Sequence, residues 1–239
     1  EHPSETDLIY DWNLVDPTRG REVQGRHVEL DDETLRDGLQ NPSVTDPTID
    51  DKLKLLHLME KIGIHVADIG LPGSSKRAFD DVLRMCREIS DNKLKLRVAC
   101  AGRTVVGDIT PMIEISQRAG MPVEVYAFIG SSPIRQFAEN WDIETIAQKS
   151  AEAIDVAVKN GLEVAYVTED TTRSRPDSLA TLFKNAIDHG ASRLCLCDTV
   201  GHSTPDGVRN LIGFTRSIIA GMGADVGIDW HGHNDRGLA

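Results

Sequence analysis

The sequence predicts an α/β protein with a (β/α)8 barrel of the TIM type, and three observations support this fold class. Short runs of β-branched residues alternate with longer segments of helical spacing, which indicates parallel strands joined by helices. The first run is followed by residues 33–38 (ETLRDG) in place of the glycine-rich fingerprint of an open dinucleotide-binding sheet. Polar side chains also follow the predicted strands at their C-terminal ends, where TIM barrels place their chemistry.

Each predicted strand is a short apolar run bounded by polar or glycine-containing segments. The seven predicted strands are His27–Asp31, His65–Ile69, Leu94–Ala99, Val123–Phe128, Glu163–Thr168, Arg193–Cys197 and Val226–Trp230. Because parallel strands need a return path between them, we expect the intervening segments to be helices.

Helical spacing is clearest in three of these intervening segments. Residues 50–62 carry apolar side chains at Leu53, Leu56, Met59 and Ile62, which share one helix face. Residues 143–159 end before Asn160-Gly161, and residues 177–189 end before Gly190. Because glycine commonly terminates helices, both boundaries are predicted with a physical reason.

The predicted domain organisation is an N-terminal arm, residues 1–26, followed by the barrel, residues 27–239. Pro3, Pro17, Gly20 and Gly25 favour an extended conformation for the arm. The sequence stops at Ala239, soon after the seventh predicted strand. We therefore expect the barrel to be incomplete at its C-terminal end, with an eighth strand and the last two helices lying beyond this residue.

The composition is that of a globular protein with a sizeable core. Of 239 residues, 40% are hydrophobic and 27% are charged, and the formal net charge is −12. A nucleic-acid partner is not expected because Lys and Arg form no basic stripe. No apolar run approaches the roughly 18–20 residues of a membrane span, so we expect no membrane association and a cytoplasmic location.

Asp37, His231 and His233 are the strongest candidates for a metal site. Residues two apart on a strand point to the same side, so both imidazoles would face the barrel mouth. Closure of a barrel would bring the end of the first strand, with Asp37, next to the last strands. Two imidazoles and one carboxylate leave coordination positions open and suit Zn, Mn or a related divalent ion.

Four motifs resemble one enzyme superfamily, and they occur in its order along the chain. They are residues 32–38 (DETLRDG), 169–173 (EDTTR), 198–201 (DTVG) and 231–239 (HGHNDRGLA). The superfamily contains the isopropylmalate, homocitrate and citramalate synthases together with 3-hydroxy-3-methylglutaryl-CoA lyase. The resemblance covers about residue 28 to the end of the chain and implies a metal-dependent TIM barrel.

This resemblance implies roles for the residues of the first and last motifs. Asp37, His231 and His233 would be the protein ligands of a divalent metal, either Mn, Mg or Zn. Arg36 is similar to the arginine of the superfamily that stabilises charge developing on the substrate carbonyl. Asn234-Asp235 would orient the histidines from outside the ligand shell.

The two middle motifs add Glu169 and Thr199. Glu169 resembles an active-site glutamate, and Thr199 resembles the threonine that hydrogen-bonds the substrate carboxylate. The residue types alone leave plainer alternatives open. Thr199 would also suit a helix cap, Glu169 an ion pair with Arg173, and Arg36 a surface salt bridge.

The implied reaction is a Claisen condensation of acetyl-CoA with a 2-oxo acid, followed by thioester hydrolysis. The motifs are most similar to the isopropylmalate synthases of leucine biosynthesis, so 2-oxoisovalerate is the expected substrate and a homodimer the expected assembly. Citramalate and homocitrate synthesis are close alternatives. A carbon–carbon lyase remains open because residues 38–41 (GLQN) look like the lyase branch, and a catalytically inactive regulatory barrel is a third possibility.

Val167, Cys195 and Cys197 are predicted to contact the side chain of the 2-oxo acid. Strand alternation turns them to the same side as the proposed site residues, and they are small and largely apolar. Tyr126 occupies a position where leucine-pathway enzymes tend to have His, and its ring would shrink this pocket. The two cysteines are expected to be buried reduced thiols, with a zinc site as the alternative.

Overall fold

The computed structural model describes residues 27–234 and residue 237. The chain divides into two compact units, residues 1–30 and 31–239, and each is described by itself. Within the first unit, residues 27–30 have no regular secondary structure. The predicted arm, residues 1–26, lies outside the described residues, so its boundary stays a prediction.

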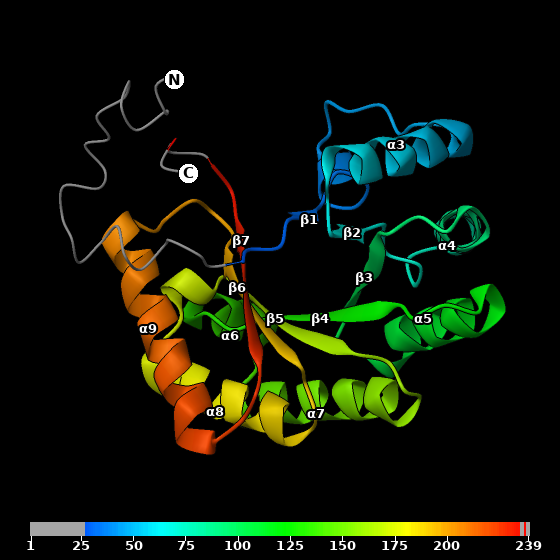
Figure 1. Cartoon of the computed structure of the whole chain (residues 1–239). Helices are drawn as coiled ribbons and strands as arrows, with labels where there is room; N and C mark the ends of the chain where they lie inside the picture. The colour runs from blue at the N-terminus through cyan, green and yellow to red at the C-terminus, as the bar shows by residue number, and fades with distance from the viewer. Residues whose placement is uncertain (1–26, 235–236, 238–239) are drawn as a thin grey trace, which may run out of the picture. The chain divides into compact units, whose positions relative to one another are not determined.

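The second unit contains a seven-stranded sheet in which every strand runs parallel to its neighbours, in the order of the sequence (Figure 1). Its strands are β1 (Asp31–Asp32), β2 (Val66–Asp68), β3 (Arg97–Arg103), β4 (Glu124–Gly130), β5 (Val164–Glu169), β6 (Arg193–Asp198) and β7 (Gly227–Gly232).

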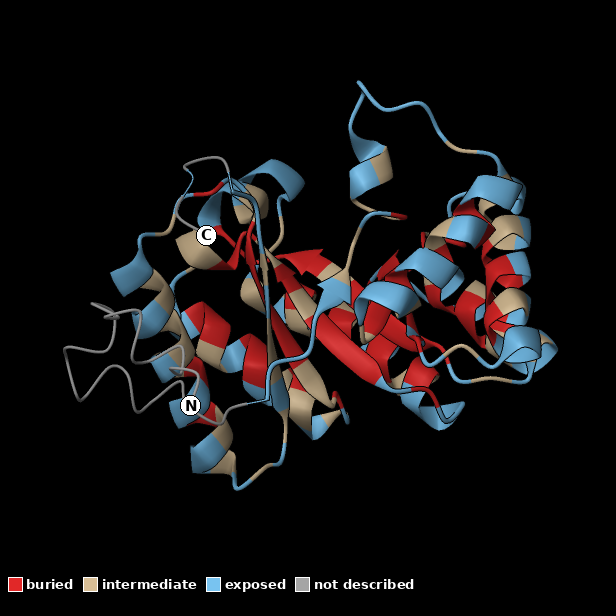
Figure 2. Cartoon of the chain, turned by 45° about the horizontal axis from the view of Figure 1, so that its top comes forward, coloured by how far each residue is buried: buried red, intermediate tan, exposed pale blue. Residues whose placement is uncertain are grey.

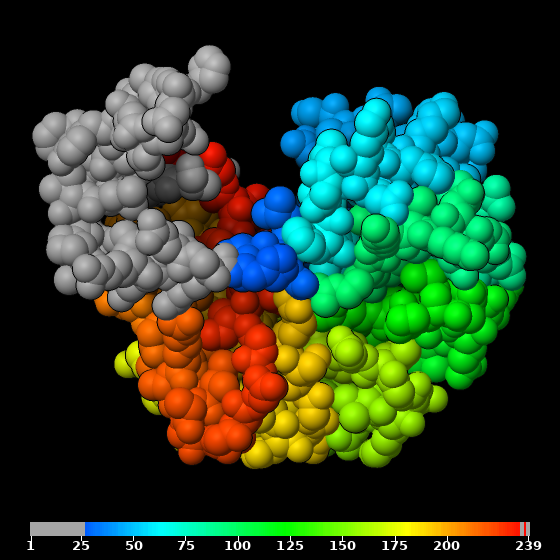
Figure 3. Space-filling model, in the orientation of Figure 1, coloured from blue at the N-terminus to red at the C-terminus, as the bar shows by residue number. Residues whose placement is uncertain are grey.

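Helices connect each strand to the next. The long helices are α3 (Ile49–Ile62), α4 (Lys76–Asn92), α5 (Val106–Ala119), α7 (Ile143–Lys159), α8 (Pro176–Asp188) and α9 (Pro205–Met222). Three short elements lie in the loops after strands, namely η2 (Gly38–Gln40), α6 (Pro133–Glu139) and η3 (Thr171–Arg173). In the space-filling view the β/α repeats follow one another around the sheet in sequence order (Figure 3). The predicted TIM-type β/α architecture is confirmed for the described residues.

Local sequence signals explain where the helices begin and end. Thr48 begins α3 by accepting a hydrogen bond from the backbone of Asp51, and Gly63 ends it with a φ of +89°. Helix α7 spans Ile143–Lys159, as the apolar spacing predicts, and Gly161 follows it with a φ of +77°. Such left-handed conformations favour glycine because it lacks a Cβ atom.

All seven strands differ from the predicted boundaries, five of them by one or two residues at an end and β1 and β3 by more. Strand β1 has only two residues, Asp31 and Asp32. Its pairing starts at Asp31, which is opposite Val66, the first residue of β2. The predicted strand His27–Asp31 is therefore wrong for residues 27–30. The third extends past its predicted end to Arg103, through small residues that pair with β4, including Ala101 with Tyr126.

The two faces of the sheet are packed differently. Alternate residues of β3 illustrate this, since Val98 and Cys100 join the large core beneath the helices, whereas Ala99 and Ala101 join a smaller cluster with Tyr126. Figure 2 shows the buried residues concentrated along the strands and the sheet-facing sides of the helices. Small side chains on the inner face leave room for a cavity.

None of the helices in the described part of the chain has the length and apolar character needed to cross a bilayer.

Candidate metal and substrate site

A cavity of about 270 Å³ lies at the C-terminal ends of the strands. It is lined by every candidate site residue predicted from the sequence, namely Arg36, Asp37, Tyr126, Val167, Glu169, Cys195, Cys197, Thr199, His231 and His233. It is also lined by residues that were not predicted as site residues, namely Glu33, Gln40, Asp68, Leu71, Ala101 and Phe128. The fold therefore brings the predicted residues together, and their chemical roles stay predictions.

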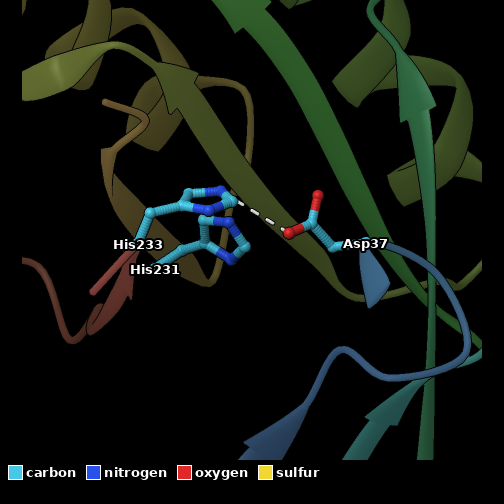
Figure 4. A group of neighbouring side chains, drawn as sticks. All are labelled: Asp37, His231 and His233. Atoms are coloured by element: carbon cyan, nitrogen blue, oxygen red, sulfur yellow. Dashed lines mark ion pairs between the residues drawn. The ribbon is translucent and has the colours of Figure 1, made fainter. Parts of the chain in front are cut away.

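Asp37, His231 and His233 form a group that could hold a metal ion (Figure 4). One ligand atom from each residue lies within 4.8 Å of the others, and His233 Nε2 is 3.5 Å from Asp37 Oδ2. Asp37 comes from the loop after β1, whereas His231 lies near the end of β7 and His233 directly follows this strand. Two ring nitrogens and one carboxylate oxygen are a donor set that fits a divalent ion.

Arg36 is surrounded by carboxylates beside this group. Its NH2 is 2.5 Å from Glu33 Oε2, its NH1 is 3.2 Å from Asp37 Oδ1 and its Nε is 3.1 Å from Asp68 Oδ2. The Arg36 side chain is 17% exposed, so the alternative of a surface salt bridge is wrong. Burial alone would lower the pKa of Arg36, but the neighbouring carboxylates outweigh it and raise that pKa.

The charges of this cluster favour a bound cation. Three carboxyl groups contact one guanidinium. Even with Asp68 protonated, the carboxylates of Glu33 and Asp37 exceed the charge of Arg36 by one when the imidazoles are neutral. Asp68 is fully buried, and burial followed by the charge of Glu33 raises its pKa well above the usual range. A divalent ion between Asp37 and the histidines would balance the excess charge, so the residues present fit such an ion.

Glu33 contacts a second member of the site, since its Oε1 is 3.2 Å from His231 Nδ1. The hydrogen bond to Glu33 is the main cause that raises the pKa of His231. Neither Glu33 nor Asp68 was among the site residues predicted from the sequence. The sequence contains a weak signal for each residue. Glu33 lies two residues after Asp31, so a strand through both would turn them to the same side. Asp68 is a charged residue in an otherwise apolar strand segment.

Part of the cavity lining is apolar. Val167, Cys195 and Cys197 all line the cavity, and both cysteines are buried free thiols. The potential metal-holding group found among the described residues includes neither cysteine, which disfavours the zinc alternative. Tyr126 also lines the cavity, and its hydroxyl donates to Asp31 Oδ2 at 2.6 Å. This bond directs the hydroxyl to Asp31 and leaves the ring to form the wall.

Thr199 is positioned by a loop contact. Its Oγ1 accepts a hydrogen bond from the backbone N–H of Asp170 at 2.9 Å. Thr204 caps helix α9 instead, so the alternative that Thr199 is a helix cap is wrong. Because Asp170 uses the oxygen of Thr199 as an acceptor, the hydroxyl hydrogen remains to be donated to another group in the cavity.

Glu169 stands at the end of β5 with its side chain 34% exposed. Its Oε1 is 3.7 Å from Arg135 Nε, while Arg173 forms a bidentate pair with Asp170. The alternative of an ion pair between Glu169 and Arg173 is therefore wrong. The predicted orienting role of Asn234-Asp235 stays a prediction, and residue 235 lies outside the described residues.

The β/α barrel and its potential metal site agree with the comparison of the sequence with protein families. The model of the HMGL-like family matches residues 27–239, and the chain belongs to this family.

Curated relatives carry the name 2-isopropylmalate synthase. The protein of Sulfolobus acidocaldarius is 33% identical over 218 residues, which are 91% of this chain and 53% of the relative. The protein of Pyrococcus abyssi is 31% identical over 215 residues, which are 90% of this chain and 43% of the relative. The chain thus spans about half the length of these relatives.

Solved structures with the same fold include two HMG-CoA lyases. The lyase of Brucella melitensis has a TM-score of 0.61 at 18% identity, covering 85% of this chain and 80% of its own. The lyase of Bacillus subtilis has a TM-score of 0.62 at 17% identity, covering 84% and 76%. At these identities the likeness concerns the fold.

Proposed function

We propose that this chain forms the catalytic barrel of an enzyme that condenses acetyl-CoA with a 2-oxo acid, and that 2-oxoisovalerate is its substrate. The products would be 2-isopropylmalate and CoA, with one water consumed in thioester hydrolysis. The observation that carries the proposal is the placement of Arg36 and Thr199 around one cavity with the group Asp37, His231 and His233. The names of the curated relatives support the same choice.

Asp37, His231 and His233 are the residues proposed to hold a divalent ion. When bound there, Mn, Mg or Zn would act as a Lewis acid toward the keto oxygen of the 2-oxo acid. The residues contribute a site with open positions, since they supply three ligand atoms in all.

Arg36 is proposed to stabilise negative charge on the keto oxygen as the new carbon–carbon bond forms. Glu33, Asp37 and Asp68 fix its guanidinium before any ligand arrives. A hydrogen-bond donor that is already oriented does not have to reorganise as charge develops on the substrate. Such preorganised donors make a large contribution to stabilising the transition state.

Thr199 and Glu169 are proposed to contact the substrate from the other side of the cavity. The Thr199 hydroxyl hydrogen is available to the carboxylate of the 2-oxo acid because its oxygen is already occupied by Asp170. Glu169 is loosely paired with Arg135 and partly exposed, so its carboxylate is accessible for exchange of a proton with the ligand.

The lining of the cavity supports an aliphatic side chain on the 2-oxo acid. Val167, Cys195 and Cys197 offer small apolar surfaces, and Arg36 is already paired with carboxylates. The distal carboxylate of 2-oxoglutarate would be buried against this wall without a partner, which is costly. We expect 2-oxoisovalerate to be preferred, pyruvate and 2-oxobutyrate to react more slowly, and 2-oxoglutarate to be rejected.

The test is release of free thiol from acetyl-CoA with each of these four acids and with added Mn, Mg or Zn. A preference for 2-oxoisovalerate in the specificity constants supports the proposal. A preference for pyruvate would make the activity that of a citramalate synthase, since the ring of Tyr126 would then limit the pocket. A preference for 2-oxoglutarate would overturn the assignment of the apolar wall.

A second candidate is cleavage of a hydroxyacyl-CoA, favoured by residues 38–41 (GLQN), of which Gln40 lines the cavity. The two functions differ in the direction of the carbon–carbon bond chemistry. Formation of acetyl-CoA and acetoacetate from 3-hydroxy-3-methylglutaryl-CoA, with no thiol release in the condensation assay, would favour this second function.

A further inference from the structure

Glu33 lies between the two halves of the proposed site. Its Oε1 is 3.2 Å from Nδ1 of His231, and its Oε2 is 2.5 Å from NH2 of Arg36. The side chain is 22% exposed, comparable to the 20% of His231 and the 17% of Arg36. One carboxylate thus contacts a residue proposed to bind the metal and the residue proposed to stabilise charge on the substrate.

We propose that Glu33 is a positioning residue that fixes the tautomer and orientation of His231 for metal binding and at the same time holds Arg36. The proposal rests on the assignment of the metal ligands in the proposed function. It concerns a residue for which the superfamily motifs gave no role.

The chemistry of the contact determines the tautomer of His231. An ionised carboxylate can only accept hydrogen bonds, so the Nδ1 that faces Glu33 must carry its proton. In the neutral ring the lone pair is then on Nε2, which is the nitrogen left to coordinate a metal. Carboxylates that accept from a metal-binding histidine in this way orient the ring and increase the basicity of the coordinating nitrogen.

The position of Glu33 in the fold gives this contact a second consequence. β1 pairs with β2 and β7 pairs with β6, so β1 and β7 are the two edges of the seven-stranded sheet. Glu33 directly follows β1, whereas His231 lies on β7. The side-chain contact therefore joins the two edges across the site. It aligns Asp37, which comes from the first edge, with the histidines of the second.

The experiment measures metal binding to the metal-free protein and does not depend on turnover. Mn²⁺ is titrated into wild type and Glu33→Gln, and free Mn²⁺ is followed by electron paramagnetic resonance. Glutamine keeps the size of the side chain, but its single acceptor oxygen cannot serve both His231 and Arg36. We expect the dissociation constant for Mn²⁺ to rise by about 10–100-fold, as for other partners of metal-binding histidines.

Asp229→Asn is the matched control. Asp229 lies on the same strand as His231, is 18% exposed and pairs with Arg193, so its substitution also removes a part-buried carboxylate from an arginine. We expect this variant to lose stability and to keep the wild-type affinity for Mn²⁺. An equal loss of affinity in both variants would mean that Glu33 acts through general stability, which overturns the proposal.

Asp37→Asn separates failure of this proposal from failure of the proposed function. If wild type binds Mn²⁺, Asp37→Asn does not and Glu33→Gln binds like wild type, the Glu33 proposal fails while the metal site stands. If wild type and Asp37→Asn bind equally, the metal site and the proposed function fail together.

The tautomer of His231 can also be measured in the wild-type protein, which covers the case in which Glu33→Gln does not fold. Nitrogen-15 shifts of the metal-free protein distinguish a ring protonated at Nδ1 from one protonated at Nε2. We expect the neutral ring, observed once the pH is high enough to remove one proton, to be protonated at Nδ1. A neutral ring protonated at Nε2 would contradict the proposal.

Discussion

Thr199→Val is the substitution that isolates one hydrogen bond to the substrate. The Thr199 hydroxyl accepts from the backbone N–H of Asp170 at 2.9 Å and is proposed to donate to the carboxylate of the 2-oxo acid. Valine has nearly the same shape as threonine, so it removes the hydroxyl without opening a cavity. Loss of this group should therefore affect binding and stability separately, and both can be measured.

The expected magnitudes follow from the two bonds that Thr199 makes. A hydrogen bond to a charged carboxylate contributes about 1.5–3 kcal/mol, which corresponds to a loss of roughly 10–150-fold in kcat/KM. The N–H of Asp170, whose residue is 2% exposed, would also lose its acceptor. That loss should cost about 1–3 kcal/mol in the free energy of unfolding.

Thr199→Ser is the control, because serine keeps the hydroxyl and loses a methyl group. Steady-state thiol release at varied 2-oxo acid gives kcat/KM, and urea unfolding gives the stability of each variant. We expect Thr199→Val to be impaired in both measurements and Thr199→Ser to resemble wild type. If the valine variant matches the serine variant in kcat/KM, Thr199 does not bind the substrate carboxylate and its position serves the loop alone.

Two further predictions concern Arg36 and Glu124. Arg36→Lys keeps the charge but loses the planar fork, so turnover should fall by about 10²–10³-fold with a smaller change in 2-oxo acid affinity; normal turnover would refute the oxyanion role. Burial raises the pKa of Glu124 from 4.5 to about 7. Between pH 4.5 and 7 the folded state therefore holds a proton that the unfolded state has lost. This difference contributes about 3 kcal/mol to the free energy of unfolding, which is fully present below pH 4.5 and is lost as pH rises through 7. Urea unfolding of Glu124→Gln at pH 5 and 8 should show a weaker pH dependence than wild type.

The site residues that lie at the C-terminal ends of strands could be predicted from the sequence. The carboxyl ends of parallel strands meet at one edge of the sheet. Val167 and Glu169 of β5 are therefore expected near Cys197 of β6 and near Thr199, which directly follows β6. The period of two along a strand fixed which of these side chains face the cavity. No knowledge of long-range geometry was needed for this part.

The contacts of Glu33 and Asp68 could not be predicted in the same way. Glu33 meets His231 because the curvature of the sheet brings its two edges together, and the periodicity of single strands does not specify that curvature. The alternative pairing of Glu169 with Arg173 is wrong for a local reason. Asp170 adopts a left-handed conformation with a φ of +62°, and Arg173 pairs with Asp170 instead.

The charges around Arg36 connect the stability of the barrel to the function proposed for it. Asp68 is fully buried and its raised pKa favours its neutral form, so Glu33 and Asp37 are the carboxylates that give the cluster more negative charge than Arg36 can balance. Such an excess is costly in a partly desolvated site, so the cluster favours any state in which a cation is bound. A ligand that binds the folded state alone stabilises it, by about 2.7 kcal/mol at a hundredfold excess over the dissociation constant. The acidic residues that orient Arg36 therefore also favour the cation that the proposed reaction requires.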